Sequence, residues 1–363
     1  MRILIIGGSN SLLKGGYVHG LAQALQGHAE AEIIQVSVGA TTSLAAIGRL
    51  HETFTGAPVD FILYEYGIND AGHFAPRAGG AESWLMCFHL LLKTAAQLYP
   101  TAMFVPLVLA QQAHFPATVP LPFYDAQLAA YRALGLDFID VRAWMSALFL
   151  GRAPDWMYMD PAHYAAPHAT SIIGALVARH LLKLRQHPVP PLSAALERLL
   201  AHSPHARLEA MYVRAANLQQ FTSGPVERIQ SGNRLMQLEC LRMLPGSRLQ
   251  LNSAAFPLAV FLKSDTGHQC MQLELSTPEG MYFNACVATR HADTETLPFI
   301  YSNIPLPLLW GNSLLMRYGA SQLTLSVPAQ QAGPLAGFDC YMPGQAGAPN
   351  HLDLVGLLML VQP

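Results

Sequence analysis

The sequence predicts an α/β domain built on an open parallel sheet, followed by a domain of antiparallel β-strands. Two observations lead to this fold class. In the first half of the chain, short apolar runs alternate with segments of helical periodicity, which is typical of a parallel sheet covered by helices on both faces. Beyond about residue 205, many short β-type stretches are separated by Pro, Gly, Ser and Asn, as in an antiparallel sandwich or jelly roll.

The first domain contains a series of apolar runs that we interpret as buried strands, at 3–6, 31–38, 61–66, 102–109 and 137–141. Helical periodicity is found at 16–25, 83–98, 122–134 and 169–184. Right-handed crossovers between such strands give a doubly wound sheet, in which active sites form at the carboxyl ends of the strands. The residues that follow the apolar runs are therefore the first candidates for chemistry.

A proline-rich segment marks the predicted domain boundary. His187-Pro188-Val189-Pro190-Pro191 ends the preceding helix, because proline cannot continue a helix, and a short helix is expected at 192–201. We expect a first domain at 1–187, a linker with this short helix at 188–204, and a β-rich domain at 205–363. Strands of the second domain are expected at 209–215, 235–241, 247–251, 258–262, 271–275, 281–288, 314–318, 322–327 and 351–361.

The composition indicates a folded protein without a polyanionic partner. Of the 363 residues, 52% are hydrophobic and 12% are charged, whereas disordered chains are rich in charge. The formal net charge of −2 offers no basic surface, so we expect no nucleic-acid partner. The apolar stretches are shorter than the roughly 20 residues of a spanning helix, so we expect no membrane span. The N-terminus lacks the pattern of a signal peptide, and we expect a cytoplasmic protein.

Cysteine and glycine patterns argue against a metal or an organic cofactor. The five cysteines are odd in number and scattered, without a Cys-x-x-Cys pair. We expect reduced, buried thiols rather than disulfides or zinc ligands. The glycine turn at Gly7 and Gly8 lacks the third glycine of a dinucleotide fingerprint and the Gly-Lys-Ser/Thr of a phosphate-binding loop. We therefore expect no cofactor.

Polar residues at separate places in the first domain together meet the requirements of acyl transfer by serine. That chemistry needs a hydroxyl nucleophile, an imidazole base, a carboxylate that orients the base, and donors for the oxyanion. Ser9, His163 and Asp160 can supply the first three. The backbone N–H groups of Ser9 and Gly39 and the side-chain amide of Asn69 can supply the donors.

The residue types suit these roles. Gly8 permits a tight turn that exposes the Ser9 hydroxyl, and Gly39 lets the backbone approach a substrate without a Cβ. The helix that follows Ser9 would point its N-terminus at developing negative charge. The spacing Asp160-x-x-His163 lets the carboxylate hold the ring while the second ring nitrogen faces Ser9.

This pattern resembles the SGNH, or GDSL-type, hydrolase superfamily, whose sequence blocks contribute a serine, a glycine, an asparagine and an Asp/His pair. The matching blocks are Gly7-Gly8-Ser9-Asn10-Ser11, Gly39, Gly67-Ile68-Asn69-Asp70 and Asp160-Pro161-Ala162-His163. The resemblance covers about residues 1–185 and implies a three-layer α/β/α, flavodoxin-like domain. The first block has Gly-Gly-Ser where the family usually has Gly-Asp-Ser, and the missing aspartate is generally a structural residue of the turn.

The resemblance implies a serine esterase that forms an acyl-enzyme on Ser9 and removes a small acyl group, often acetyl, from a carbohydrate. The expected partner is thus a glycan or small-molecule ester. His73 and Tyr164 lie beside the blocks and are predicted to contact the substrate. Three alternatives stay open: Ser11 as the nucleophile, a glycan O-acyltransferase with the same triad, and a non-catalytic carbohydrate-binding protein.

Each of these residues also has a simpler, structural interpretation. Ser9 and Asp160 can cap helices, and Gly39 can serve only a turn. Asn69 and Asp70 can form an Asx turn, and we assign Asp70 to turn structure. In the β-rich domain, which is also a candidate surface for a homo-oligomer, aromatic residues suit either sugar stacking or the core: Tyr282, Phe283, Tyr301, Trp310 and Tyr318.

Overall fold

The computed structural model describes residues 1–28, 30–116, 118–233, 236–265, 269–278, 280–289, 299–310, 321–329 and 350–361. The chain divides into two compact units, Met1–Ala206 and Arg207–Pro363. The segment expected as a linker with a short helix, 188–204, lies in the first unit. There α8 (Leu192–His202) packs against α4 (Gly80–Leu98).

A parallel sheet forms the middle layer of the first unit. Its described strands, five in number, have the order β2-β1-β3-β4-β5, and each adjacent pair is parallel. The strands are β1 (Arg2–Gly7), β2 (Glu32–Gln35), β3 (Phe61–Glu65), β4 (Met103–Val108) and β5 (Ile139–Asp140). Each strand overlaps one of the apolar runs that were predicted as strands, although β2 and β5 are shorter than expected. The predicted doubly wound sheet is confirmed.

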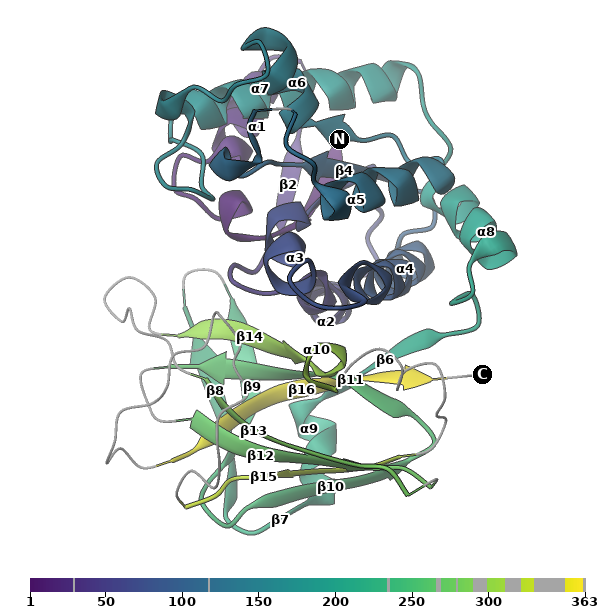
Figure 1. Cartoon of the computed structure of the whole chain (residues 1–363), viewed down its shortest axis with the longest axis vertical. Coiled ribbons are helices and arrows are strands. Elements are labelled where there is room, and N and C mark those ends of the chain that lie inside the picture. The colour runs from purple at the N-terminus through teal and green to yellow at the C-terminus, as the bar shows by residue number, and fades with distance from the viewer. Residues whose placement is uncertain are drawn as a thin grey trace. The chain divides into compact units, whose positions relative to one another are not determined.

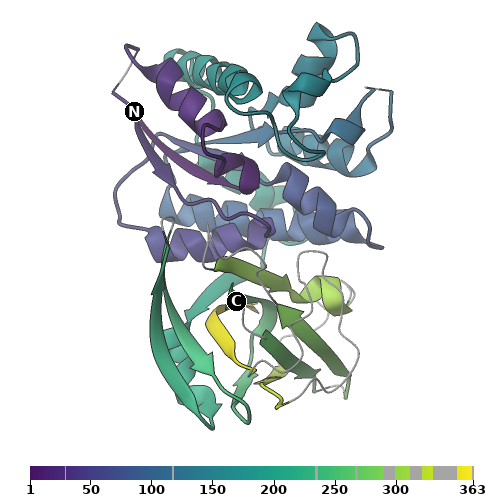
Figure 2. The ribbon, with the colours of Figure 1, turned by 90° about the vertical axis from the view of Figure 1, so that its left-hand side faces the viewer.

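Helices cover both faces of this sheet (Figure 1). The pair α1 and α7 packs on one face, and the pair α2 and α4 packs on the other, which Figure 2 shows from a second direction. The remaining bounds are α1 (Tyr17–Leu25), α2 (Ser43–Thr53), α3 (Gly67–Phe74), α5 (Pro122–Ala133), α6 (Val141–Leu148), α7 (His168–Gln186), and the 3-10 turns η1 (Ser9–Ser11), η2 (Gln112–His114) and η3 (Asp155–Met157). The sequence did not predict α2, α3 or α6.

Alternate side chains of the strands pack on opposite faces of the sheet. Ile5 of β1 belongs to a core with Leu21 of α1 and Ile173 of α7. On the other face, the ring of Tyr64 in β3 packs 5.5 Å from that of Phe88 in α4. Because both faces are buried, the strands read as continuous apolar runs in the sequence.

A short turn separates β1 from α1. Ser9–Ser11 forms a single 3-10 turn, and α1 begins at Tyr17, as the helical periodicity at 16–25 predicted. Gly15 has a φ of 67°, a left-handed conformation that glycine adopts without strain. Support of Ser9 by the N-terminus of the following helix stays a prediction.

The second unit is antiparallel, as predicted. In its described residues one sheet has the order β13-β12-β15-β10-β7, and the other has the order β14-β11-β16-β9-β8 with β6 paired to β16. Contacts of β12 with β16 and of β11 with β15 indicate that the sheets face each other. The bounds are β6 (Glu209–Arg214), β7 (Thr222–Ser223), β8 (Val226–Gly232), β9 (Gln237–Met243), β10 (Arg248–Ser253), β11 (Phe256–Ser264), β12 (Gln269–Ser276), β13 (Tyr282–Thr289), β14 (Ile300–Pro305), β15 (Ser321–Ser326), β16 (Leu352–Val361), α9 (Ala215–Leu218), η4 (Gln219–Phe221) and α10 (Leu306–Trp310).

Some predictions for the second unit fall outside the described residues. These are the strand at 314–318, the ring of Tyr318, the side chain of Trp310 and the thiol of Cys340. Tyr301 is buried, whereas Tyr282 is exposed. The described cysteines are buried: Cys87, Cys240, Cys270 and Cys286. None of the helices in the described part of the chain combines the length and apolarity that crossing a bilayer takes.

Candidate active site

The structure brings Ser9, His163 and Asp160 into one hydrogen-bonded chain. Ser9 Oγ lies 2.7 Å from His163 Nε2, and His163 Nδ1 lies 2.7 Å from Asp160 Oδ2. Ser9 directly follows β1, and the other two residues lie in the loop between η3 and α7. If Nδ1 of the neutral ring donates to Asp160, then Nε2 is free to accept the proton of the serine hydroxyl.

Backbone groups hold the Asp160 carboxylate in place. Asp160 Oδ1 accepts hydrogen bonds from the N–H groups of Ala162 and His163, each at 2.9 Å. Burial acts to raise the pKa of Asp160, but the hydrogen bonds from Ala162 and His163 outweigh it and hold this pKa below its usual value. An ionised carboxylate at this place orients the ring and stabilises an imidazolium.

Gly39 and Asn69, two of the predicted oxyanion donors, lie close to the turn that carries Ser9. A Cβ built on Gly39 would lie 3.4 Å from Ser9 Cβ, so the backbone of Gly39 packs directly against the serine. A Cβ on Gly8 would overlap the carboxamide of Asn69, which places this amide beside the turn that carries Ser9. Ala40, next to Gly39, has a φ of 55°; such left-handed conformations are strained in non-glycine residues and concentrate at functional sites.

Asp70 has a different structural role from the one expected. Gly67–Phe74 is a helix rather than a turn, and Asp70 is fully buried. Its carboxylate accepts hydrogen bonds from the N–H of Ser43, the hydroxyl of Tyr64 and the indole N–H of Trp84, at 2.8, 3.0 and 3.0 Å. Asp70 therefore connects α2, β3 and α4. The assignment of Asp70 to turn structure is wrong, and the alternative of an Asx turn does not hold, because the segment is helical.

The hydroxyl of Ser11 points into the core rather than toward the histidine. Ser11 Oγ lies 2.7 Å from Tyr17 Oη and donates to Glu65 Oε2 at 2.9 Å. Ser11 is 3% exposed. This placement favours Ser9 over Ser11 as the nucleophile, because only Ser9 contacts the imidazole among these two serines.

Glu65 is a buried acid below the Ser9 turn that sequence reasoning missed. Its Oε2 accepts from Ser11 Oγ and from the N–H of Gly8 at 3.3 Å. Burial raises the pKa of Glu65 to about 8, against the lowering effect of the hydrogen bonds from Ser11 and Gly8. The only sequence signal for this group was a charged residue at the end of an apolar strand run.

Asn10 is a second residue that the sequence analysis did not single out. It is 2% exposed. Its Nδ2 donates to the carbonyl of Ala162 at 3.0 Å, and its Oδ1 accepts from the N–H of Tyr164 at 3.3 Å. Asn10 thus links the Ser9 turn to the loop that carries His163.

The two residues predicted to contact substrate lie in different environments. His73 is half-buried on α3, one turn after Asn69, and therefore on the same helix face. Tyr164 is 1% exposed. Its hydroxyl donates to the carbonyl of Ala110 and accepts from the N–H of Ala110, so this placement supports a packing role rather than the predicted substrate contact.

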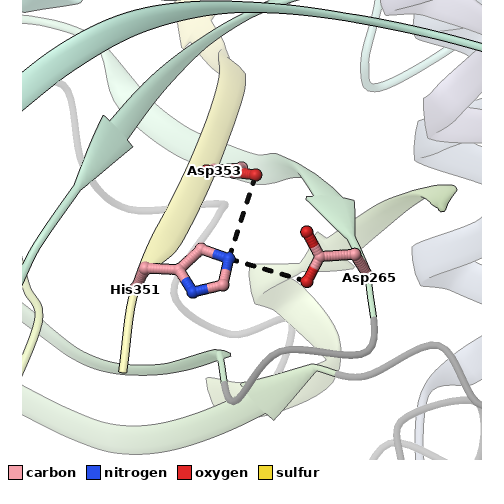
Figure 3. Close-up of side chains that lie close together, drawn as sticks. All are labelled: Asp265, His351 and Asp353. Atoms are coloured by element: carbon pink, nitrogen blue, oxygen red, sulfur yellow. Dashed lines mark ion pairs between the residues drawn. The ribbon is translucent and has the colours of Figure 1, made fainter. Parts of the chain in front are cut away.

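A polar cluster in the second unit has ligand types that suit a metal (Figure 3). Among the described residues, ligand atoms of Asp265, His351 and Asp353 lie within 4.8 Å of one another. However, Lys263 Nζ lies 2.6 Å from Asp353 and 3.0 Å from Asp265, and Arg242 forms a two-point contact with Asp353. The positive charges of Lys263 and Arg242 balance the negative charges of Asp265 and Asp353. We therefore interpret the cluster as a structural ion network rather than as a metal site.

No protein-family model and no curated protein sequence matches the chain. Among solved structures, the chain is similar to a two-domain esterase (CEX) active on acetylated mannans, co-crystallised with mannopentaose. The identity is 11%, the TM-score is 0.64, and the match covers 100% of this chain and 91% of that chain. A second structure of that esterase matches at 11% identity and a TM-score of 0.63, covering 100% and 92%.

A shorter match is an acetyl xylan esterase, AlAXEase, at 14% identity and a TM-score of 0.42, covering 52% of this chain and 100% of that chain. At 11% identity, the likeness to the two-domain esterase is a likeness of fold. Together with the parallel sheet and the antiparallel sheets that follow it, it confirms the predicted fold class: a three-layer α/β/α domain with an appended antiparallel β domain.

Proposed function

We propose that this protein is a serine esterase of SGNH type that removes a small acyl group, most readily acetyl, from a carbohydrate. The observation that carries the proposal is the continuous chain from Ser9 Oγ through His163 to the carboxylate of Asp160, with 2.7 Å at both links. The carbohydrate part of the proposal draws support from the two-domain fold that is shared with an esterase active on acetylated mannans.

In the first half-reaction, Ser9 Oγ attacks the ester carbonyl carbon while His163 Nε2 takes the hydroxyl proton. The backbone N–H groups of Ser9 and Gly39 and the amide of Asn69 donate to the oxyanion, which stabilises the tetrahedral intermediate. The intermediate collapses as His163 returns the proton to the departing sugar hydroxyl. The acyl group is then bonded to Ser9 Oγ.

In the second half-reaction, water attacks the acyl-enzyme while His163 takes one of its protons. The second intermediate collapses, the proton returns to Ser9 Oγ, and the carboxylic acid leaves. Asp160 stays ionised throughout and stabilises the imidazolium that forms in each half-reaction.

Hydrolysis is favoured over the alternative of glycan O-acyl transfer because water reaches the triad. The side chains of His163 and Asp160 are 27% and 44% exposed, whereas transfer requires that water be kept from the acyl-enzyme. The alternative of a non-catalytic binding protein is less well supported, because sugar binding alone does not require the contact between Ser9 and His163.

Steady-state hydrolysis of p-nitrophenyl acetate and of acetylated manno-oligosaccharide tests the proposal. Ser9→Ala should abolish both activities without lowering the melting temperature, because it removes only the nucleophilic oxygen. Ser11→Ala is the matched control and should retain activity. Full activity in Ser9→Ala would overturn the proposal, and a dominant transesterified product with a glycan acceptor would favour the transferase.

A further inference from the structure

A cavity of about 580 Å³ lies at the carboxyl ends of β3 and β4, which is the sheet edge that also carries Ser9. Its walls come from α3, from residues 75–82, from residues 109–114 after β4 and from the start of α5. Ligand cavities in proteins typically have about 300–1,000 Å³. We call it the α3–α5 cavity; the catalytic chemistry proposed above does not use its lining.

Residues that line the α3–α5 cavity are connected to the segments that carry Asn69 and His163. Gly67 lines it and begins the helix that contains Asn69. Gln111 lines it as well, and the next residue, Gln112, donates its N–H to the carbonyl of Pro161 in the loop of His163. The cavity and the candidate active site therefore share the same two chain segments.

Gln127 contributes a buried side-chain amide to the lining of this cavity. Its side chain lines the cavity, is 2% exposed and lies against Gly67, where a Cβ would be 3.7 Å from Oε1. Among the described residues, Gln127 Nε2 has no hydrogen-bond acceptor. An unsatisfied buried amide is costly in native proteins, so an acceptor oxygen placed here by a ligand would gain a hydrogen bond.

His114 offers a second neutral donor to the same space. Its Nδ1 accepts the N–H of Gln111 at 3.1 Å, so the proton of the neutral ring is on Nε2. Burial, assisted by the charge of Arg142, lowers the pKa of His114, so the ring is neutral near pH 7. Besides Gln127 and His114, the lining includes the amide of Gln111 and the oppositely charged side chains of Arg77 and Glu82.

The other walls suit the faces of a sugar ring. Tyr124 lines the cavity, and its ring is fixed by Arg142, which lies 5.0 Å from the ring centroid, and by a hydrogen bond from its hydroxyl to Asp140. The opposite side consists of the small residues Gly67 and Ala71 of α3. An aromatic side chain with amide and imidazole donors suits a neutral, oxygen-rich ligand, and the opposite charges of Arg77 and Glu82 in the lining leave no excess of either sign.

From these contacts we propose that the α3–α5 cavity is a binding subsite for a sugar ring of the ester substrate. Gln127 and His114 donate hydrogen bonds to the oxygens of this ring. The inference rests on the proposed esterase function, and it assigns to Gln127 a role in substrate recognition rather than in bond breaking.

Kinetic constants of Gln127→Leu test this subsite, with acetylated mannotriose and acetylated xylotriose as sugar substrates and p-nitrophenyl acetate as the substrate without a sugar. For the better of the two sugars, KM should rise about fivefold or more with kcat little changed, because one donor is lost. For p-nitrophenyl acetate, kcat/KM should stay the same. The matched control is Gln23→Leu, a substitution at an exposed position of α1. It should leave the kinetic constants for the sugar substrates and for p-nitrophenyl acetate unchanged.

The melting temperature provides a second readout. Because Gln127→Leu replaces an unpaired buried amide by an apolar group, it should melt at the wild-type temperature or above it. An unchanged KM for both sugars, or a wild-type protein that cleaves p-nitrophenyl acetate but neither sugar, would overturn the subsite and leave the serine mechanism standing. A wild-type protein that cleaves none of the three would instead overturn the proposed function.

Discussion

Asn10 holds the backbone on both sides of His163. Its amide donates to the carbonyl of Ala162 and accepts from the N–H of Tyr164, while the neighbouring residue Ser9 contacts the imidazole itself. The turn that carries the hydroxyl and the loop that carries the base are thus fastened together by adjacent residues.

We expect Asn10→Ala to lower kcat about 10- to 100-fold while KM changes little, because a misplacement of reacting groups by about 1 Å has effects of this size. Steady-state kinetics with p-nitrophenyl acetate measures both constants. Thermal melting of the same sample checks that the fold is intact. A folded variant with wild-type kcat would show that the loop of His163 is positioned by other contacts.

Asp160→Asn should lower kcat by about three orders of magnitude or more, because an amide does not favour the ring tautomer that accepts the serine proton. The exposed residue Asp155 provides a control in the same segment, and Asp155→Asn should be close to wild type. Equal rates for the two variants would contradict the role of Asp160 in orienting His163.

Asn69→Ala should reduce kcat about 100- to 1,000-fold with little change in KM, since an oxyanion donor acts mainly in the transition state. The control is Asn217→Ala at an exposed position of α9 in the second unit. A rise in KM at constant kcat would mean that Asn69 binds the ground state instead.

Glu65 makes stability depend on pH in a direction that can be worked out. The pKa of this carboxyl is about 8 in the folded protein, against a usual value of 4.5. Between these values the folded state holds the proton and the unfolded state does not, so the free energy of unfolding falls as pH rises. Glutamine cannot ionise, so the free energy of unfolding of Glu65→Gln should fall less between these pH values than that of the wild type.

Urea unfolding at pH 5 and pH 8 measures the effect. The stability of Glu65→Gln relative to wild type should increase by a few kcal/mol (~2–4) between these two pH values. Burial also raises the pKa of Asp70, to about 6. Because Asp70 is present in both proteins, its contribution to the pH dependence of stability cancels when the variant is compared with the wild type. Glu30→Gln, at an exposed position, is the control and should leave the pH dependence of stability unchanged. An unchanged pH dependence in Glu65→Gln would contradict the account, because it would mean that Glu65 is ionised in the folded state at pH 7.

The ion network of the second unit allows a matched comparison. Asp353→Ala leaves Lys263 and Arg242 without their buried partner and should cost about 3–5 kcal/mol of unfolding free energy. Glu227→Ala removes a partner of Arg242 at 4.0 Å that is 56% exposed, and it should cost less than about 1 kcal/mol. A chelator should not change the melting temperature of the wild type; a drop would show a bound metal instead.

The sequence was sufficient for the features that depend on burial along the chain. The strands are apolar because both faces of the sheet are covered, and the ends of β1 and β3 mark the positions of Ser9 and Asn69. The convergence of Ser9 and Asn69 follows from the geometry of parallel sheets, in which strand ends meet at one edge, whereas His163 comes from the loop before α7.

Other features depend on contacts between distant residues and have no local signal. Gly67, Asn69 and Asp70 individually favour a turn, yet the partners of Asp70 in α2, β3 and α4 stabilise a helix there. Gln127 looks like an ordinary polar residue of an amphipathic helix. Only the packing of α5 against α3 reveals that its amide is buried.

The most direct test of the account is covalent labelling with a fluorophosphonate, followed by mass spectrometry of the peptides. The hydrogen bond between Ser9 and His163 predicts a single adduct on Ser9, formed in the wild type and lost in both Ser9→Ala and His163→Ala. An adduct on Ser11, or ester hydrolysis that persists while Ser9 stays unlabelled, would contradict it.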